Sequence, residues 1–231
     1  SDLIHLPVIN DPEKKMILDI LMELGPAAYT AGNNNLLSLS AIKLAHYSIR
    51  HGNAPASAFG YPFYGFILGF VFNDFKSGFE LGKLGLELSR KFDSKNIYCK
   101  ALVVNAIFIY HFNRHWRTLI PELQKAIEAG IQTGDYRYMS YAAIVLPIWG
   151  IQSDIKEAVR QVEKTLSIMS ETNYHSFATL AEIIQQFLLN LQGHTTHYNT
   201  FDSHGFEEKK FLEKIKDFPL SHTFFYIYKL W

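Results

Sequence analysis

The feature that most constrains the fold is a regular spacing of residues that end helices. Turn-forming residues recur at 52–53, 73–74, 92–93, 113, 133–135, 152–153, 172–173 and 193. The segments between them are about 17 to 21 residues long, which suits helices and is too long for ordinary strands. Alternate segments begin near Glu13, Ala56, Asn96, Tyr136 and Tyr174, at intervals close to 40 residues. Intervals of this size predict stacked helical hairpins.

The two helices predicted for each hairpin differ in character. In the segment after Ser153, apolar residues such as Ile155, Val159 and Val162 follow one helical face, and charged residues occupy the other. The preceding segments, for example 101–110 and 141–149, are apolar nearly all round, and such helices must be covered on several sides. The sequence therefore predicts an all-α solenoid of about five stacked helical hairpins, whose shared core takes up the aromatic residues.

The repeat pattern also predicts how the chain is divided. We expect helical repeats over residues 1–193, a polar loop over 194–206 and closing helices over 207–231. Asp11-Pro12-Glu13 is a strong helix start, since it combines a capping Asp, a Pro at the first helical position and an acid in the first turn. The last segment, 224–231, is strongly apolar, whereas solenoids normally end in a polar cap. We expect the chain to continue into further domains, or to form a homodimer through this aromatic C-terminal end.

Charge and composition exclude several classes of protein. Lys plus Arg and Asp plus Glu both number 22, which argues against nucleic-acid binding by a basic face and against a polybasic membrane anchor. The single cysteine, Cys99, excludes a disulfide framework within the chain and a multi-cysteine zinc site. The most apolar stretch, 58–72, contains Pro62 and falls short of the roughly 20 residues that span a bilayer. We expect a buried helix there, no membrane insertion and a cytoplasmic location.

Four ordered blocks carry a resemblance to a known family. They are 47–65 (YSIRHGNAPASAFGYPFYG), 78–86 (GFELGKLGL), 112–116 (FNRHW) and 134–143 (GDYRYMSYAA). Together they resemble the helical-repeat region of large bacterial multidomain signalling proteins, and the resemblance extends from about Pro26 to Trp231. In that family a Ser/Thr-kinase-like domain and a predicted AAA/STAND-type ATPase precede the region, and GAF or PAS sensor modules and a histidine kinase often follow it.

The resemblance implies a tetratricopeptide-like (TPR-like) scaffold between an ATPase and an output module. Its partners would be the flanking ATPase and kinase domains or a partner peptide. The usual tetratricopeptide repeat has 34 residues and the interval here is nearer 40. "TPR-like" therefore describes the expected solenoid better than "TPR".

The sequence contains no convincing catalytic motif. The glycines at 78, 82 and 85 beside Lys83 do not have the spacing of a phosphate-binding loop, and close helix packing explains them better. Cys99 lies on an apolar helix, where we expect a buried thiol. We expect no enzymatic activity in this segment and no cofactor.

We predict no metal site. The residues that come nearest to one are His194, His197 and His204, which share a polar loop with Asp202. No cysteine and no helix fixes their spacing, so a solvated loop is the better interpretation.

The remaining candidates are polar and aromatic residues on the first helix of each hairpin, because those helices line the groove of a solenoid. The candidates for contact with a partner or ligand are Asn105, Tyr110, His111, Tyr138, Tyr141 and Trp149. Arg114, at a predicted turn, is a further candidate, although it could instead bond to carbonyl groups at a helix end. The tyrosines could equally be core residues whose hydroxyls reach the surface.

The expected function is that of a non-catalytic scaffold that mediates protein contacts or relays a signal within a larger ATPase or sensor kinase. The alternative is a small-molecule sensor that binds a ligand in an aromatic pocket between repeats. A ligand that copurifies with the protein would distinguish the second from the first.

Overall fold

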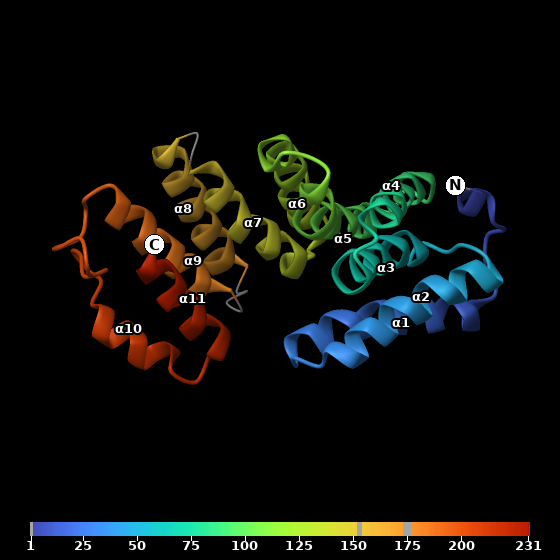
Figure 1. Cartoon of the computed structure of the whole chain (residues 1–231), viewed down its shortest axis with the longest axis horizontal. Helices are drawn as coiled ribbons and strands as arrows, with labels where there is room; N and C mark the ends of the chain where they lie inside the picture. Colours follow the sequence, from blue (N-terminus) through green and yellow to red (C-terminus); the bar gives the residue numbers. More distant parts are fainter. Residues whose placement is uncertain (1, 152–153, 173–176) are drawn as a thin grey trace. The chain divides into compact units, whose positions relative to one another are not determined.

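The computed structural model describes residues 2–151, 154–172 and 177–231. Within these ranges the fold is all-α, with eleven α-helices (Figure 1). The β-structure of the described residues is confined to two isolated bridges, Val8 with Asn53 and Ser203 with Phe206. The predicted fold class is confirmed.

The α-helices follow one another with short connections. They are α1 (Pro12–Thr30), α2 (Asn34–His51), α3 (Ser57–Phe72), α4 (Phe75–Lys91), α5 (Lys95–Val104), α6 (Ile120–Thr133), α7 (Tyr136–Gly150), α8 (Ile155–Glu171), α9 (Ala178–Leu191), α10 (Glu208–Ile215) and α11 (Pro219–Leu230). Shorter elements are the 3-10 helices η1 (Asp2–His5), η3 (Tyr110–Phe112) and η4 (Trp116–Leu119), and the π-helix η2 (Asn105–Ile109).

The first helices of the hairpins begin close to the predicted positions. Helices α1, α3, α5 and α7 begin at Pro12, Ser57, Lys95 and Tyr136. The predicted start at Tyr174 and the predicted stop at 152–153 lie outside the described residues, and α9 begins at Ala178. The spacing of helix-ending residues therefore located the starts of these four helices to within one residue.

Side-chain caps explain why the helices start where they do. Asp11 accepts hydrogen bonds from the backbone N–H groups of Glu13 and Lys14 at the start of α1, at 3.0 and 3.5 Å. Asp74 and Asp154 cap α4 and α8 in the same way. Each carboxylate satisfies N–H groups that have no partner within the helix and interacts favourably with the helix dipole.

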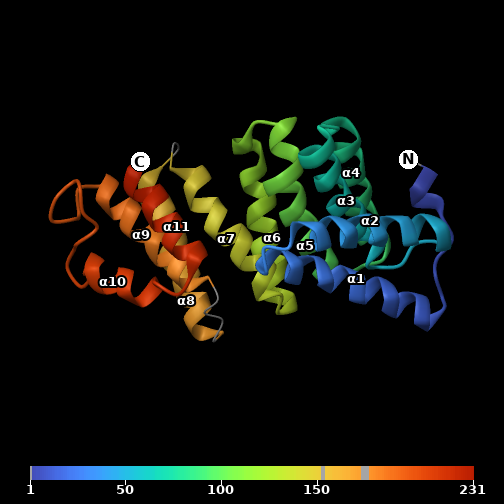
Figure 2. The ribbon, with the colours of Figure 1, turned by 60° about the horizontal axis from the view of Figure 1, so that its bottom comes forward.

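The chain forms two compact units, Ser1–Met139 and Ser140–Trp231, with the boundary inside α7. In the first unit, antiparallel neighbours pack as the pairs α1–α2, α3–α4 and α5–α6 (Figures 1 and 2). In the second unit, α8 packs against α9, and α9 packs against α11. The pairs of the first unit agree with the predicted hairpins, whereas the contacts given for the second unit, α8 with α9 and α9 with α11, are not those of the predicted pairs.

Helix α3 lies at the centre of the first unit. Phe59, Tyr61 and Phe63 are all buried, and the Tyr61 hydroxyl donates a hydrogen bond to Oδ1 of Asn53 at 3.0 Å. Burial raises the pKa of Tyr61 to about 12, so its hydroxyl remains a proton donor at neutral pH. This arrangement agrees with the expectation of a buried helix over 58–72.

Glycines let α3 and α4 approach closely. A Cβ atom on Gly78 would lie 2.7 Å from the backbone oxygen of Gly65, and one on Gly85 would lie 2.5 Å from the backbone oxygen of Ala58. The glycine pattern around Lys83 is therefore explained by packing, as the sequence suggested.

An ion-pair cluster around the buried Lys100 side chain connects α1, α5 and the start of α7. The Lys100 side chain is only 8% exposed, and its Nζ lies 2.7 Å from Glu23 Oε1 and 3.7 Å from Asp135 Oδ2. Arg137 lies 3.4 Å from the other oxygen of Glu23. Charged groups in such a position are stable only when they are paired, so α1 is held to α5 by polar contacts.

In the second unit, the apolar C-terminal helix packs on one side only. Phe225 and Tyr228 of α11 are buried, whereas Leu230 and Trp231 are largely exposed. The Trp231 ring still lies 5.9 Å from that of Phe187 on α9. The apolar C-terminal end is thus partly buried within the second unit.

Two local features were not predicted from the sequence. The turn between α1 and α2, at residues 31–33, was not predicted, although Gly32 adopts a φ of 67° and the Asn33 side chain caps α2 by accepting from the Leu36 N–H; α1 also continues through Pro26. Helix α5 ends in a π-helix at Asn105, where the sequence predicts a continuous helix to Asn113. No helix in the described ranges has the length and apolar character needed to cross a bilayer.

Candidate interaction site at the end of helix α5

The backbone changes from α-helix to π-helix at Asn105. The Tyr110 N–H donates its hydrogen bond to the carbonyl oxygen of Asn105, and the chain then turns through η3. The N–H groups of Asn113 and Arg114 both bond to the Tyr110 carbonyl oxygen, at 2.9 and 2.7 Å. Such π-turns are rare and occur frequently at functional sites.

Asn105 joins this π-turn to α4. Its side chain is fully buried, and Nδ2 donates a hydrogen bond to the Gly82 carbonyl oxygen at 2.9 Å. A Cβ atom at position 82 would lie 2.2 Å from Oδ1 of Asn105, so only glycine leaves room for this amide. The pair fixes the position of the π-turn relative to α4.

Arg114 joins the same region to α6. Its guanidinium carbon lies 4.6 Å from the centre of the Tyr110 ring and 5.4 Å from that of Phe79, and Nη1 lies 3.1 Å from Glu122 Oε1. A cation over two aromatic faces is held by cation–π attraction as well as by the ion pair. We call Gly82, Asn105, Tyr110, Arg114 and Glu122 the Asn105 cluster.

Burial changes the acid–base behaviour of this region. The pKa of Glu122 is raised, mainly by burial, although Arg114 acts in the opposite direction. Burial also raises the pKa of Tyr110 and lowers that of His111. Asn105 Oδ1, His111 Nδ1 and Glu122 Oε2 are buried without a hydrogen-bond partner in the described part of the chain. Burying a polar atom without a hydrogen-bond partner costs folding free energy. The presence of three such atoms within residues 105–122 distinguishes this region from the core.

Beside the Asn105 cluster lies a set of five phenylalanines in mutual contact. We call Phe66, Phe70, Phe75, Phe108 and Phe112 the aromatic edge. The ring centres of successive pairs are 4.3 to 5.8 Å apart, closest between residues 75 and 112. The outer two, at 70 and 112, are 52% and 43% exposed, and the neighbouring residues at 71 and 72 are also exposed. Exposed apolar patches of this kind mark interaction sites.

The other candidates from the sequence lie elsewhere. Tyr138 is buried in the first unit, 5.9 Å from the ring of Phe59 and beneath the Lys100 ammonium group. Tyr141 belongs to the second unit and contacts Phe177 at 5.0 Å. Trp149, also in the second unit, is partly exposed near the end of α7. Of the seven candidates, the structure gathers Asn105, Tyr110 and Arg114 in one cluster, with the adjacent residue 111 beside them.

Cys99 lies on α5 and is buried. Its Sγ contacts the Ala126 carbonyl oxygen at 3.2 Å, and burial raises its pKa to about 12. A thiol with such a pKa is protonated at neutral pH and is a poor nucleophile.

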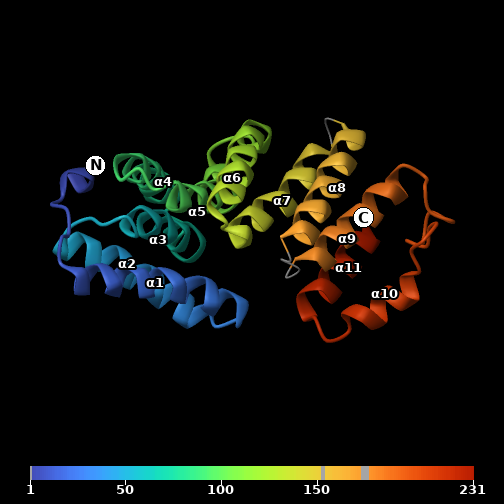
Figure 3. The same ribbon diagram turned by 180° about the vertical axis from the view of Figure 1, so that it is seen from behind.

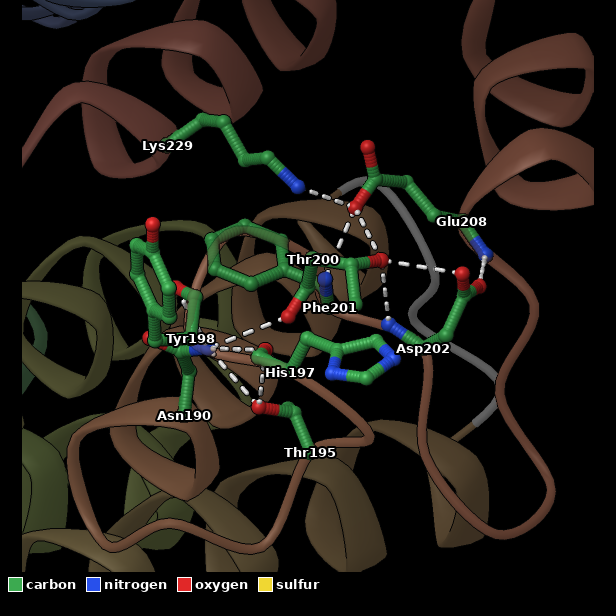
Figure 4. Close-up of polar contacts among 9 residues, drawn as sticks. All are labelled: Asn190, Thr195, His197, Tyr198, Thr200, Phe201, Asp202, Glu208 and Lys229. Atoms are coloured by element: carbon green, nitrogen blue, oxygen red, sulfur yellow. Dashed lines mark hydrogen bonds and ion pairs between the residues drawn. The ribbon is translucent and has the colours of Figure 1, made fainter.

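The three loop histidines belong to a segment organised by other residues. The Asn190 amide donates hydrogen bonds to Thr195 Oγ1 and to the Thr200 carbonyl oxygen (Figure 4). Glu208 accepts from the Phe201 N–H at 2.7 Å and pairs with Lys229 of α11. These bonds connect the loop to α9, α10 and α11, so the loop is a packed structural element of the second unit.

The surroundings of the loop histidines can be followed from Asp202. Asp202, the carboxylate nearest in sequence, accepts hydrogen bonds from the Glu208 N–H and the Thr200 hydroxyl. These hydrogen bonds lower the pKa of the Asp202 carboxyl, and the bond from the Glu208 N–H contributes most. Among the residues described by the structure, no group of three or more His, Cys, Asp or Glu side chains is placed to hold one metal ion. His194, His197 and His204 are therefore not assembled into such a site.

Sequence reasoning missed Gly82 and Glu122 as members of the cluster, and it missed the aromatic edge. The i, i+4 spacing of Phe66 and Phe70 was visible, but it is also the spacing of a core helix. Only the packing of α3 against α4 and η3 shows that these rings reach the surface.

Replacing Asn105 with alanine is expected to lower the free energy of unfolding by about 2 kcal/mol, because a buried hydrogen bond is lost and a small cavity forms. Asn113→Ala is the matched control. Asn113 is exposed, and its hydrogen bond in the turn comes from its backbone N–H, which alanine keeps. Urea denaturation would measure both variants. Equal stabilities would contradict a structural role for the Asn105 side chain.

Comparison with known proteins shows a similarity to part of a signalling protein. No family model matches the chain. The chain is similar to hybrid signal transduction histidine kinase G of Dictyostelium discoideum, with 26% identity over 183 residues. The match covers 76% of this chain and 5% of the kinase. The chain is thus related to part of a signalling protein, and this agrees with the signalling character that the resemblance implied.

Proposed function

We propose that this chain is a non-catalytic module that binds a protein partner and relays a signal within a larger signalling protein. The observation that carries the proposal is the aromatic edge, an exposed set of contacting phenylalanines on the first unit. The relation to part of a histidine kinase supports a role in signalling.

The proposed partner is a protein segment with apolar side chains. Apolar side chains suit the exposed rings of Phe70 and Phe112. The charge beside the edge is already balanced, since Arg114 pairs with Glu122 at 3.1 Å and Asp74 precedes Phe75. Apolar contact is therefore the main expected attraction.

The contacts behind the aromatic edge offer a route for the relay. Phe112 contacts Phe75 at the start of α4, and it lies on the same 3-10 turn as Tyr110. Tyr110 is connected through Arg114 to Glu122 of α6. A partner that displaces the ring at 112 would therefore act on α4 and α6 together.

Photo-crosslinking tests this function. Benzoylphenylalanine at position 70, in cells that make the full-length protein, should give a crosslink to a protein that can then be purified. Calorimetry should show that Phe70→Ser raises the Kd for that protein at least tenfold, because an interfacial phenylalanine contributes about 1.5–3 kcal/mol.

The matched control is Tyr198→Ser, because Tyr198 is an exposed aromatic residue of the second unit. It should leave the Kd unchanged. The absence of any crosslink, or equal affinities of wild type and Phe70→Ser, would contradict the proposal. A copurified small molecule whose binding shifts the melting temperature, with no protein partner, would favour the sensor alternative.

A further inference from the structure

Residues 3–9, which precede α1, lie as a strap across one end of the first unit. We call them the N-terminal strap. They lie beside α4 and beside the connection between α2 and α3, where Val8 forms a parallel β-bridge with Asn53 (Figure 3). The strap is at the start of α3, whereas the aromatic edge is at the end of α3. The two features therefore belong to opposite ends of the α3–α4 pair.

Asn53 holds the strap through both its backbone and its side chain. Its N–H donates a hydrogen bond to the Pro7 carbonyl oxygen at 2.7 Å, and its carbonyl oxygen accepts one from the Ile9 N–H at 2.8 Å. Its Nδ2 donates to the Leu3 carbonyl oxygen at 2.7 Å, while its Oδ1 accepts from the Tyr61 hydroxyl. Three of these four bonds connect Asn53 to the main chain of the strap.

Two further residues of the helical body contact the main chain of the strap. Lys91, at the end of α4, donates from Nζ to the Ile4 carbonyl oxygen at 2.9 Å. Gly52 has a φ of 111°, and a Cβ atom there would lie 2.2 Å from the Pro7 carbonyl oxygen. We call Gly52, Asn53 and Lys91 the strap site. Because its hydrogen bonds go to backbone atoms, the site recognises an extended main chain more than particular side chains.

The strap itself buries little apolar surface. Among residues 3–9, all of which the structure describes, Ile9 alone is buried, at 4% exposed, and its neighbour Val8 is 48% exposed. A segment with few buried apolar groups opens at low cost in free energy. Asn53, in contrast, is fully buried, and release of the strap would remove the partners of its N–H, its carbonyl oxygen and its Nδ2. The open site would therefore favour a new occupant with the same backbone groups.

We propose that the strap site binds extended peptide segments and that the N-terminal strap is its exchangeable occupant. When the strap is released, an extended segment of another protein takes its place and forms the same main-chain bonds, as in strand addition. The strap shows the chemistry of that segment, which is uncharged and mostly aliphatic, since five of the seven residues in LIHLPVI are aliphatic. This site is separate from the aromatic edge and does not depend on the function proposed for it.

The length of the connection to α1 sets how strongly the strap competes. Asn10 and Asp11 alone separate the strap from Pro12, the first residue of α1. A strap on so short a connection acts at an effective concentration of about 1 mM. A free peptide that binds the open site with a Kd of about 10 μM would then bind the wild type about a hundredfold more weakly, because the site is open in about 1% of the molecules.

Fluorescence anisotropy of a labelled peptide of residues 2–10 tests this exchange on the 231-residue chain. Ile9→Glu should release the strap, because it places a carboxylate at a buried position, and this variant should bind the peptide with a Kd of about 10 μM. Val8→Glu is the matched control, because Val8 is half exposed, and it should bind as weakly as the wild type. Circular dichroism would verify that both variants are folded.

A modified peptide tests whether the main chain is recognised. Methylation of the Ile9 backbone nitrogen in the peptide removes the N–H that bonds to the Asn53 carbonyl oxygen and leaves the side chain unchanged. It should raise the Kd for the Ile9→Glu protein at least tenfold. Equal affinities of the methylated and unmethylated peptides would contradict binding by the strap's own hydrogen bonds.

Hydrogen exchange of the wild type provides a measurement that does not depend on a variant. The N–H groups of Ile9 and Asn53, which bond between strap and site, should be protected only about a hundredfold. Exchange of both as slow as the slowest amides of α3 would show a permanent strap and would overturn the proposal, whether or not Ile9→Glu folds. A folded Ile9→Glu variant that does not bind the peptide, or that binds it no better than the wild type, would also overturn it.

Discussion

Replacing Gly85 with alanine is expected to lower the free energy of unfolding by about 3 kcal/mol. The added Cβ would lie 2.2 Å from Cγ of Pro62 and 2.5 Å from the backbone oxygen of Ala58. Neither a proline ring nor a helical carbonyl can rotate away, so α3 and α4 must separate. The loss should reduce Tm by roughly 6–12 °C, and differential scanning calorimetry would measure it.

Gly150→Ala is the matched control for this prediction. Among the residues that the structure describes, a Cβ there would meet Oε1 of Gln161 alone, at the ordinary distance of 3.7 Å, and alanine is the better helix former. We expect no loss of stability, or a gain of up to about 1 kcal/mol. A Gly85→Ala variant as stable as Gly150→Ala would show that α3 and α4 do not pack as closely as the structure indicates.

Replacing Lys100 with methionine is expected to lower the free energy of unfolding at pH 7 by about 3 kcal/mol. Methionine keeps the length of the side chain and removes the charge that faces Glu23 and Asp135. The cost arises because Asp135, whose side chain is 11% exposed, loses its cation, whereas Glu23 keeps Arg137. Chemical denaturation at several pH values would measure it.

The loss in Lys100→Met should become smaller as the pH falls towards 4.5. Burial, foremost, and then Glu23 raise the pKa of Asp19 above 3.8, whereas Lys100 lowers it. The folded carboxyl therefore holds its proton to a higher pH than the unfolded one. Its contribution to stability is present at low pH and is lost as the pH rises through the folded pKa. Without Lys100 the pKa of Asp19 in the folded protein rises further. At low pH, protonation of Asp19 therefore offsets more of the stability that the variant loses.

Lys83→Met is the matched control, because the Lys83 side chain is about half exposed and pairs with Glu80 at 3.5 Å on the same helix. Surface pairs of this kind contribute about 0.3–0.5 kcal/mol. A loss in Lys100→Met that is as small as in Lys83→Met, or independent of pH, would contradict the role given to the buried cluster.

Local signals in the sequence were sufficient to locate most helices. Asp11 before Pro12, Asp74 after Asn73 and Gly134 after Thr133 act on their own neighbours in the chain, through capping bonds and backbone conformation. Such interactions are the same in any fold, so they can be read directly. The turn between α1 and α2 was missed although it carries the same kind of signal, a glycine at positive φ (Gly32) followed by a capping Asn33.

The candidate site could be predicted only in part. Asn105, Tyr110 and Arg114 were selected because they are polar or aromatic groups near the end of a first helix, and the structure gathers them. The expected groove would have exposed Asn105 and Tyr138, but both are buried. Glu122 was missed because it joins the cluster through α6, and the sequence does not show which turn faces which helix.

The sequence by itself determined the all-α class, the interval of about 40 residues and the absence of a recognisable catalytic motif, because capping, periodicity and residue chemistry are local properties. Only the tertiary structure decided which apolar residues remain exposed to solvent. Phe59 and Phe70 lie on the same helix with the same chemistry, yet one is buried against Tyr138 and the other is half exposed at the aromatic edge. The difference arises from how neighbouring helices pack at each end of α3, and contacts between residues distant in the chain have no local signature.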